Sequence, residues 1–519
     1  CPTSIEFLST RPDGEDISPV TLWRSTMMAN AAKDPFWQAK VTAEVSAHPQ
    51  YQTIIEDKCL TCHSPLGRTE ALYNGAPYYT LQEMQTDTLA LDGVSCTSCH
   101  QIQDVNLGDP SSFSGHYVIE NIRLIYGPYP QPFEPPMITW VHYVPTYGPH
   151  MLTSEMCATC HTLFTPTVDN NGQIIGEAPE QTPYLEWLNS DYPAQDIRCQ
   201  SCHVPELDYP VVISNMPVWL QPLTPFYKHY FVGGNTFMLK ILRDHAAELG
   251  VTATTEQFDS TIARTYRQLQ NETAELSAIY SWIDSNTLQV NVAVKNKTGH
   301  KFPSAYPSRR SWLYFNLSGA GGQSVFTSGD WNPQTGEINQ LDAPYETHYN
   351  LISDGGQVQV YEALIKDVDD QVTYTLLRAA GFKKDNRIPP QGFTTTGPAY
   401  DSTRIEGLAL QDANFNISNG VEGSGSDTVT YKIGGLNATH AYQLEVKLLY
   451  QSLMPRYAED LFQYSTPEVA RFQNFYQQAD KSPVTIDSLS MDIITTAVLT
   501  PGDIAPESLL LLTAYPNPF

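Results

Sequence analysis

The feature that most constrains this chain is a short pattern, Cys-x-x-Cys-His, which recurs between residues 59 and 203. The four copies are Cys59-Leu60-Thr61-Cys62-His63, Cys96-Thr97-Ser98-Cys99-His100, Cys157-Ala158-Thr159-Cys160-His161 and Cys199-Gln200-Ser201-Cys202-His203. Two thiols at this spacing reach the two vinyl groups of one porphyrin, and the histidine that follows is held beneath the iron, so the pattern is the attachment signature of c-type haem. The sequence therefore predicts four covalently bound haem c groups, with His63, His100, His161 and His203 as proximal iron ligands.

Three other interpretations of these cysteines are disulfide bonds, zinc sites and a thioredoxin-like redox pair. Neither a zinc knuckle nor a disulfide framework requires a histidine directly after the second cysteine, and here all four copies have one. The copies use eight of the nine cysteines of the chain, which leaves little room for chance. Because haem c is attached outside the cytoplasm, the pattern also predicts an exported protein.

Composition limits the classes of partner. The chain has 519 residues, of which 41% are hydrophobic, so it can bury a core. Its formal net charge of −27 argues against nucleic acid or an anionic membrane surface as a partner, because both repel such a protein. No run of about 18 apolar residues is present, so we expect no membrane-spanning helix. No signal peptide is visible in the first 20 residues.

The patterning of the chain changes after the last motif. Residues 1–253 contain Pro/Tyr/Gly-rich stretches between the motifs, and we expect a mostly irregular and α-helical tetrahaem domain there. Residues 254–272 predict a connecting helix, with Thr254 and Gln257 as its capping box. Alternating apolar residues and Gly/Asn/Asp turns over 273–500 predict a β-sandwich, and 501–519 form a terminal segment. The predicted fold class is α+β.

Individual elements follow from the same patterns. In the first part we expect short helices at Leu22–Ala32, Phe36–Ala47 and Met238–Leu249. The second part should begin with a hairpin of residues 276–282 and 288–294. Further strands are expected at Trp312–Leu317, Gln357–Ile365, Val372–Arg378, Thr428–Ile433 and Ala441–Tyr450, and one helix at Pro467–Ala479.

Each haem iron has a second axial position. Nine of the thirteen histidines lie outside the motifs, so four of them can complete bis-His haems suited to electron transfer. With fewer distal ligands, one iron would stay open, as catalysis requires.

Several sequence blocks resemble the multihaem c-type cytochromes related to cytochrome c554, in the variety that carries a C-terminal β domain. The blocks are Leu22-Trp23-Arg24-Ser25-Thr26-Met27-Met28, Asp34-Pro35-Phe36-Trp37, Gly93-Val94-Ser95, Tyr147-Gly148-Pro149-His150, His229-Tyr230-Phe231-Val232-Gly233-Gly234-Asn235, Thr298-Gly299-His300-Lys301-Phe302-Pro303 and Pro307-Ser308-Arg309-Arg310. The resemblance covers roughly residues 20 to 400. It implies that His48, His150, His229 and His300 are the distal iron ligands.

Other roles stay open for these residues. His48 precedes Pro49 and could instead cap a helix, and His300 could be a buried polar anchor of the β domain. The reserve ligands are His142, His116 and His348, followed by Met151 and Met156. Arg309 and Arg310 either neutralise haem propionates or form a structural ion pair in the sandwich.

Sequence features at the two ends of the chain indicate where the protein is located relative to the cell. The C-terminal Tyr515-Pro516-Asn517-Pro518-Phe519 resembles the start of a type IX secretion sorting domain, which implies export to the cell surface or the medium. Cys1 is either a lipid-modified lipoprotein residue or simply a free or intermolecularly paired thiol. We therefore expect an extracellular or outer-surface protein, with Cys1 as a candidate lipid anchor.

These observations favour an electron carrier over an enzyme. No nucleotide-binding motif accompanies the haem motifs. The predicted function is electron transfer along closely packed bis-His haems to redox partner proteins or extracellular acceptors, and its sharper form is self-association into a conductive filament. The alternatives are a multihaem nitrogen or sulfur oxyanion reductase or hydroxylamine-type oxidase with one open haem, and a surface adhesin whose β domain binds partners.

Overall fold

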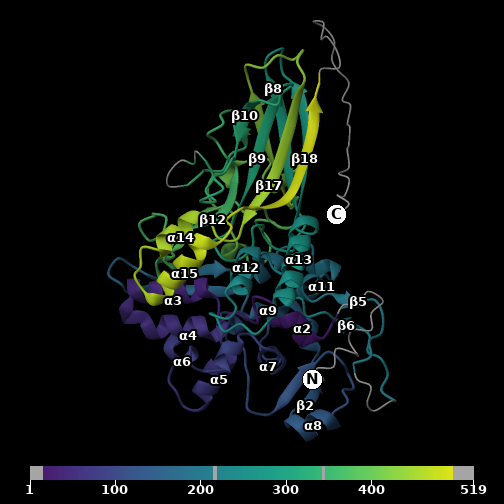
Figure 1. Cartoon of the computed structure of the whole chain (residues 1–519), viewed down its shortest axis with the longest axis vertical. Coiled ribbons are helices and arrows are strands. Elements are labelled where there is room, and N and C mark those ends of the chain that lie inside the picture. The colour runs from purple at the N-terminus through teal and green to yellow at the C-terminus, as the bar shows by residue number, and fades with distance from the viewer. Residues whose placement is uncertain (1–15, 214–218, 340, 342–344, 495–519) are drawn as a thin grey trace.

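The structure is a computed structural model that describes residues 16–213, 219–339, 341 and 345–494. Cys1 and the C-terminal Tyr-Pro-Asn-Pro-Phe segment lie outside the described residues. Figure 1 shows long strands at one end of the molecule and short helices at the other, with a layer of helices between them. The predicted α+β fold class is confirmed.

The motif-bearing part is built from short helices and three small strand pairs. The strand pairs are β1 (Leu124–Gly127) with β2 (Val144–Tyr147), β3 (Leu163–Val168) with β4 (Ile174–Gln181), and β5 (Glu206–Leu207) with β6 (Phe226–Tyr227). The helices are α2 (Pro19–Arg24), α3 (Pro35–Ala47), α4 (Gln52–His63), α5 (Pro65–Tyr73), α6 (Leu81–Met84), α7 (Cys96–His100), α8 (Pro135–Val141), α9 (Ser154–Ala158), α10 (Pro183–Leu188), α11 (Cys199–His203) and α12 (Thr236–Asp244). Proline at the first turn starts several of them, because its missing N–H is not needed there.

The strands at the other end form two facing sheets. The larger has the order β13-β12-β9-β17-β18 with β10 added beside β9, and the smaller has the order β11-β16-β8-β7. The long strands are β7 (Ala274–Trp282), β8 (Leu288–Asn296), β9 (Arg310–Gly319), β12 (Val360–Lys366), β16 (Ser426–Ile433), β17 (Tyr442–Gln451) and β18 (Val484–Ile493). The short ones are β10 (Ser324–Ser328), β11 (Leu351–Ile352), β13 (Gly381–Asp385) and the separate pair β14 (Ile417–Ser418) and β15 (Val421–Glu422).

Alternating apolar residues explain why the two sheets face each other. Val290, Val292 and Val294 of β8 have no solvent exposure and belong to one core cluster with Phe315 and Leu317 of β9. Side chains that alternate along a strand point to one face of the sheet, so each sheet places its apolar face inward. The arrangement is a β-sandwich.

Helix α13 (Thr255–Asn271) connects the two parts, as expected for residues 254–272. The Thr254 side chain accepts from the Gln257 N–H and the Gln257 side chain accepts from the Thr254 N–H, which is a complete capping box. Phe258, Ile262 and Leu269 face the core at helical spacing. Figure 1 shows this helix running from the sandwich toward the motif-bearing helices.

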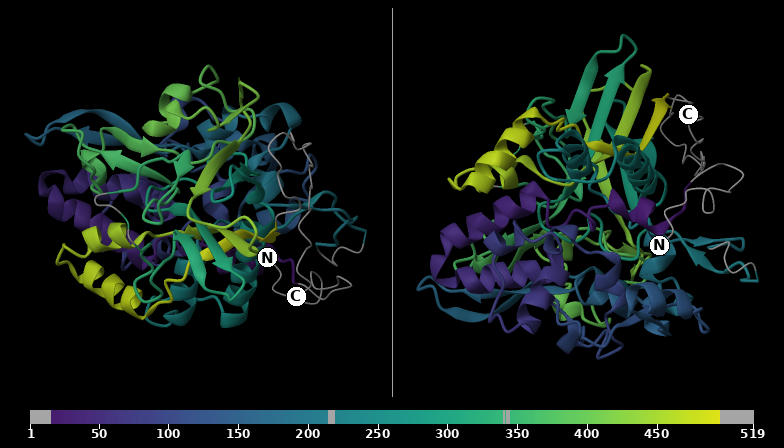
Figure 2. Two further views of the ribbon diagram at one scale, coloured as in Figure 1. Left: turned by 90° about the horizontal axis from the view of Figure 1, so that it is seen from above. Right: turned by 60° about the horizontal axis from the view of Figure 1, so that its bottom comes forward.

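Two helices late in the sequence pack against helices of the first part of the chain. They are α14 (Pro455–Leu461) and α15 (Pro467–Gln478), and α15 lies against α3 (Figure 2). Phe472 and Tyr457 share a core cluster with Ala39, Ala43 and residues of α12. The division of the chain at residues 253 and 273 stays a prediction, and this helical layer packs across it.

Two of the element predictions were wrong. The segment Leu22–Ala32 is helical only to Arg24, because the Asn30 side chain donates to the carbonyls of Arg24 and Thr26 at 3.1 and 2.9 Å, so the chain turns there. The segment Val372–Arg378 forms a single bridge and a 3-10 turn instead of a strand.

Candidate haem-binding site

Each of the four motifs lies on or beside a short helix. The first occupies the end of α4, the second is α7, the fourth is α11, and the third crosses the end of α9. Helical geometry brings residues three positions apart onto one face, so the two cysteines of a motif present their thiols to the same side. The eight motif cysteines are free, and all are half-buried or exposed although free cysteine is usually a buried residue. These thiols are therefore positioned for covalent attachment.

The motifs lie next to one another in space. The thiols of Cys62 and Cys160 are within hydrogen-bonding reach of each other, and so are those of Cys157 and Cys199. These contacts join the first motif to the third and the third to the fourth. Porphyrins attached at these thiols would be close neighbours.

The candidate ligand histidines are in the form that binds iron. Desolvation lowers the pKa of His63, His161, His229 and His300 to about 4. Desolvation also lowers the pKa of His48, His100 and His203. These imidazoles are neutral near pH 7, and a neutral imidazole is the ligand form.

Backbone carbonyls orient three of the four motif histidines. Nδ1 of His63 lies 3.2 Å from the Ala31 carbonyl, that of His100 lies 2.5 Å from Tyr126, and that of His203 lies 2.6 Å from Val232. A carbonyl can only accept, so each Nδ1 carries the proton and each Nε2 keeps its lone pair for a metal. In addition, Trp37 stacks on His63 with ring centroids 4.4 Å apart and an interplanar angle of 5°.

Two of the expected distal histidines lie opposite motif histidines. The ring centroids of His100 and His229 are 6.3 Å apart, with an interplanar angle of 22°. Those of His203 and His300 are 6.4 Å apart, with an angle of 18°. Metal–imidazole bonds are about 2 Å long, so two imidazoles on opposite sides of one iron have centroids about 6 Å apart. Both pairs therefore fit a bis-His haem.

The other two expected distal ligands have no such partner ring among the described residues. His48 ends α3 as its C-cap, and its Nε2 is buried without a hydrogen bond. A buried, unbonded ring nitrogen is costly unless a further ligand satisfies it. His150 is buried and lies close enough to His100 to affect its pKa, but its Nε2 lies 2.9 Å from the Ile102 carbonyl.

The reserve ligands are less suitable. His116 and His142 are exposed. His348 lies in the sandwich, where its Nε2 contacts Asp412 at 3.0 Å and its Nδ1 accepts from Gln359 and Asn386. Both ring nitrogens of His348 are therefore engaged by side chains of the sandwich and not directed at a haem motif.

The two neighbouring arginines have different surroundings. Arg310 is buried and pairs with Glu337 at 2.6 Å, so it forms the structural ion pair of the sandwich. Arg309 donates to the Ser304 carbonyl at 2.9 Å, and within the described chain no carboxylate lies within ion-pair distance of it.

Sequence reasoning missed the groups that orient the ligands. The carbonyls of Ala31, Tyr126 and Val232 leave no trace in residue type, because any residue supplies a carbonyl. Trp37 was visible only as part of the Asp-Pro-Phe-Trp block.

Comparison with known proteins places the fold. No family model and no curated protein matches the sequence. Among solved structures, the chain is similar to a penta-haem cytochrome c552 from Thermochromatium tepidum, with a TM-score of 0.51 and 15% identity over 91% of this chain and 95% of that one. The chain has the fold of a multihaem c-type cytochrome. The closer relationship to cytochrome c554 stays a prediction.

Among the described residues, no helix of this cytochrome fold combines the length and the apolar character that crossing a membrane requires.

Proposed function

We propose that the chain is an electron-transfer protein that holds four haem c groups in a close array. The observation that carries this proposal is the presence of two pairs of histidine rings, with centroids 6.3 and 6.4 Å apart, each formed by a motif histidine and a histidine from a distant segment. Haem supplies reversible one-electron oxidation and reduction of its iron. The residues of the chain attach it, hold two imidazoles toward the iron and keep them neutral.

Two of the proposed ligand sets follow from the geometry. His229 completes the haem of His100, and His300 completes the haem of His203. By elimination, we assign His48 and His150 to the two remaining haems, those of His63 and His161. His150 then has to exchange its contact with the Ile102 carbonyl for the iron.

The number of haems is the first test. We expect a pyridine haemochrome assay on the mature protein, normalised to protein concentration, to give about four haems per chain. Cys199→Ala/Cys202→Ala should lower this by one, because both thioether bonds of one porphyrin are lost. A value of three or fewer in fully matured wild-type protein would contradict the four-haem proposal.

The alternative function is an enzyme with one open haem. His63 and His161 are the positions where this could occur, because no histidine ring lies opposite them in the described residues. An optical spectrum separates the two functions. A carrier with four bis-His haems shows no high-spin charge-transfer band in the ferric state, whereas an oxyanion reductase or hydroxylamine-type oxidase shows one.

The proposed partners are redox proteins, extracellular acceptors and further copies of the chain, at the cell surface or in the medium. The Tyr-Pro-Asn-Pro-Phe terminus supports this location. Exposed apolar side chains support self-association: Ile138, Trp140 and Val141 of α8 are 41%, 82% and 49% exposed. In residues 122–147 the only acidic or basic side chains besides His142 are Arg123 and Glu134, so repulsion between copies of a −27 chain is weakest here.

The weakly charged surface formed by residues 122–147, with the exposed apolar side chains of α8, predicts the effect of one substitution on assembly. It adjoins the His100 haem, because Tyr126 of β1 supplies the carbonyl that orients His100. We expect electron microscopy of the secreted wild-type protein to show filaments, and Trp140→Asp to abolish them, since a buried unpaired carboxylate is costly. The matched control is Ile279→Asp, which alters a 65% exposed apolar residue of β7 and should leave assembly intact. Wild-type protein that stays monomeric at high concentration and high salt would contradict the filament.

A further inference from the structure

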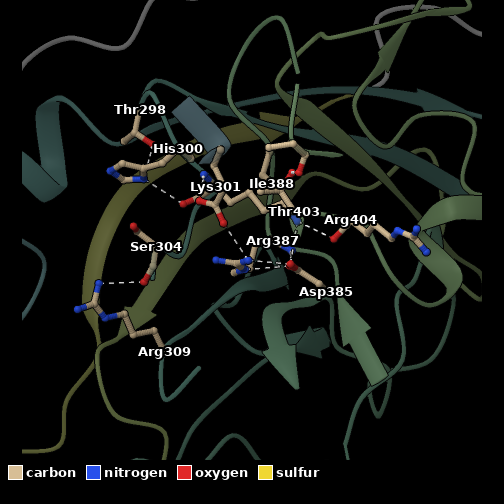
Figure 3. A network of polar contacts seen from close by, with 12 residues as sticks. Thr298, His300, Lys301, Ser304, Arg309, Asp385, Arg387, Ile388, Thr403 and Arg404 are labelled. Atoms are coloured by element: carbon tan, nitrogen blue, oxygen red, sulfur yellow. Dashed lines mark hydrogen bonds and ion pairs between the residues drawn. The ribbon is translucent and has the colours of Figure 1, made fainter. Parts of the chain in front are cut away.

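Arg309 lies on the loop between His300 and β9, and its side chain extends to the same side as the candidate ligand His300. Figure 3 shows the His300 ring and the Arg309 guanidinium extending to the same side of a polar network, away from Asp385. Since His300 lies opposite His203, the charge of Arg309 is on the side of the network where the fourth motif lies.

The charge of Arg309 has no partner in the described chain. The guanidinium is half-buried, and its one hydrogen bond is from Nη1 to the Ser304 carbonyl at 2.9 Å. A guanidinium has five N–H donors, so most of its capacity is unused. The other cations of this region are neutralised, since Lys301 and Arg387 both contact Asp385 at 2.7 Å and Arg310 contacts Glu337.

A carboxylate group of a bound cofactor would accept from the unused N–H donors of Arg309 and neutralise its charge. Arginine in a partly buried position binds carboxylates through two parallel N–H···O bonds, and each haem carries two propionates. We propose that Arg309 binds a propionate of the haem held between His203 and His300. This inference rests on the proposed four-haem function, and it assigns a role to a residue that neither attaches the porphyrin nor ligates the iron.

The test is a potentiometric titration of the holoprotein carrying Arg309→Gln. A nearby cation favours the reduced haem, which is less positive than the oxidised one, so its removal should lower the midpoint potential of one haem. We expect about a tenfold change in the oxidised-to-reduced ratio of that haem at fixed potential, which is about 59 mV for one electron. All four haems should stay low-spin, because no iron ligand is changed.

Two variants serve as controls. Arg404→Gln removes the same charge from a 52% exposed side chain on the opposite side of the network in Figure 3, and it should leave all four potentials unchanged. Arg309→Lys keeps the charge and should restore most of the potential. To decide which haem is involved, Arg309→Gln is combined with His300→Ala. Compared with His300→Ala alone, a shift of the high-spin haem supports the contact at the His203 haem, and a shift of a low-spin haem contradicts it.

The outcomes separate this inference from the proposed function. If the haem content is four but the Arg309→Gln titration superimposes on that of Arg404→Gln, the propionate contact is wrong and the carrier function stands. If Arg309→Gln yields no holoprotein, Arg309→Lys decides: wild-type potentials support the contact, and a second failure to mature shows that Arg309 serves folding instead. A wild-type haem content below four contradicts the proposed function itself.

Discussion

A His300→Ala variant is expected to convert one of the four haems from low-spin to high-spin, which is about a quarter of the iron in the electron paramagnetic resonance spectrum. The reason is geometric, since His300 lies opposite His203 with a centroid distance of 6.4 Å and the described residues place no second histidine opposite that ring. His229→Ala should have the same effect on the His100 haem, and the double variant should convert about half of the iron.

The matched control is His440→Ala. His440 is an exposed histidine of the sandwich, in the loop before β17, and its removal should leave all haems low-spin. The haem content of His300→Ala should stay at the wild-type value, because Cys199 and Cys202 are unchanged. An unchanged spin state in the His300 variant would remove this residue from the ligand set and return it to the role of a polar anchor.

An Asp385→Asn variant is expected to lose about 3–5 kcal/mol of unfolding free energy, because it leaves the buried Lys301 without its ion-pair partner and Arg387 with Glu186 alone. Asp385 is 1% exposed and contacts Lys301 and Arg387 at 2.7 Å each. Arg387 and Lys301 hold the pKa of Asp385 below its usual range although burial alone would raise it. The cluster continues to Glu186 of α10, which accepts from the Lys301 N–H at 2.9 Å.

Urea unfolding followed by circular dichroism measures this loss. The control is Asp401→Asn, which breaks an ion pair between an 87% exposed carboxylate and Arg404 and should change stability little. Because Lys301 directly follows His300, the Asp385 variant should also show partial high-spin haem. Equal stability of the two variants would mean that the buried cluster does not hold the loop in place.

Local patterns predicted the elements whose hydrogen bonds are local. The capping box at Thr254 and the hairpin of β7 and β8 are examples, since their partners lie within a few residues or across one turn. The strand expected at 372–378 was wrong for the opposite reason. The Glu44 carboxylate, from α3, accepts from the backbone N–H of Leu376 at 2.7 Å and of Leu377 at 3.4 Å, so these donors are not free for a sheet.

The haem motifs could be identified from five consecutive residues, but the pairing of their histidines could not. His100 and His229 are far apart in sequence, as are His203 and His300, and no local rule relates them. For the same reason, the sequence does not reveal the backbone carbonyls that orient three of the motif histidines. Resemblance supplied four distal candidates, the structure brings two of them opposite motif histidines, and the assignment of all four stays a prediction.

The packing of α15 against α3 has a consequence for the order of events as the exported chain folds. Arg471 bonds Gln38 across 433 positions, and Thr466 bonds Thr42 at 2.7 Å across 424. Contacts between segments so far apart in sequence require the closure of a very long loop, and they form more slowly than local contacts. Until α15 packs on α3, the helical core beside the motifs is incomplete, so the thiols are accessible to the enzymes that attach haem outside the cytoplasm.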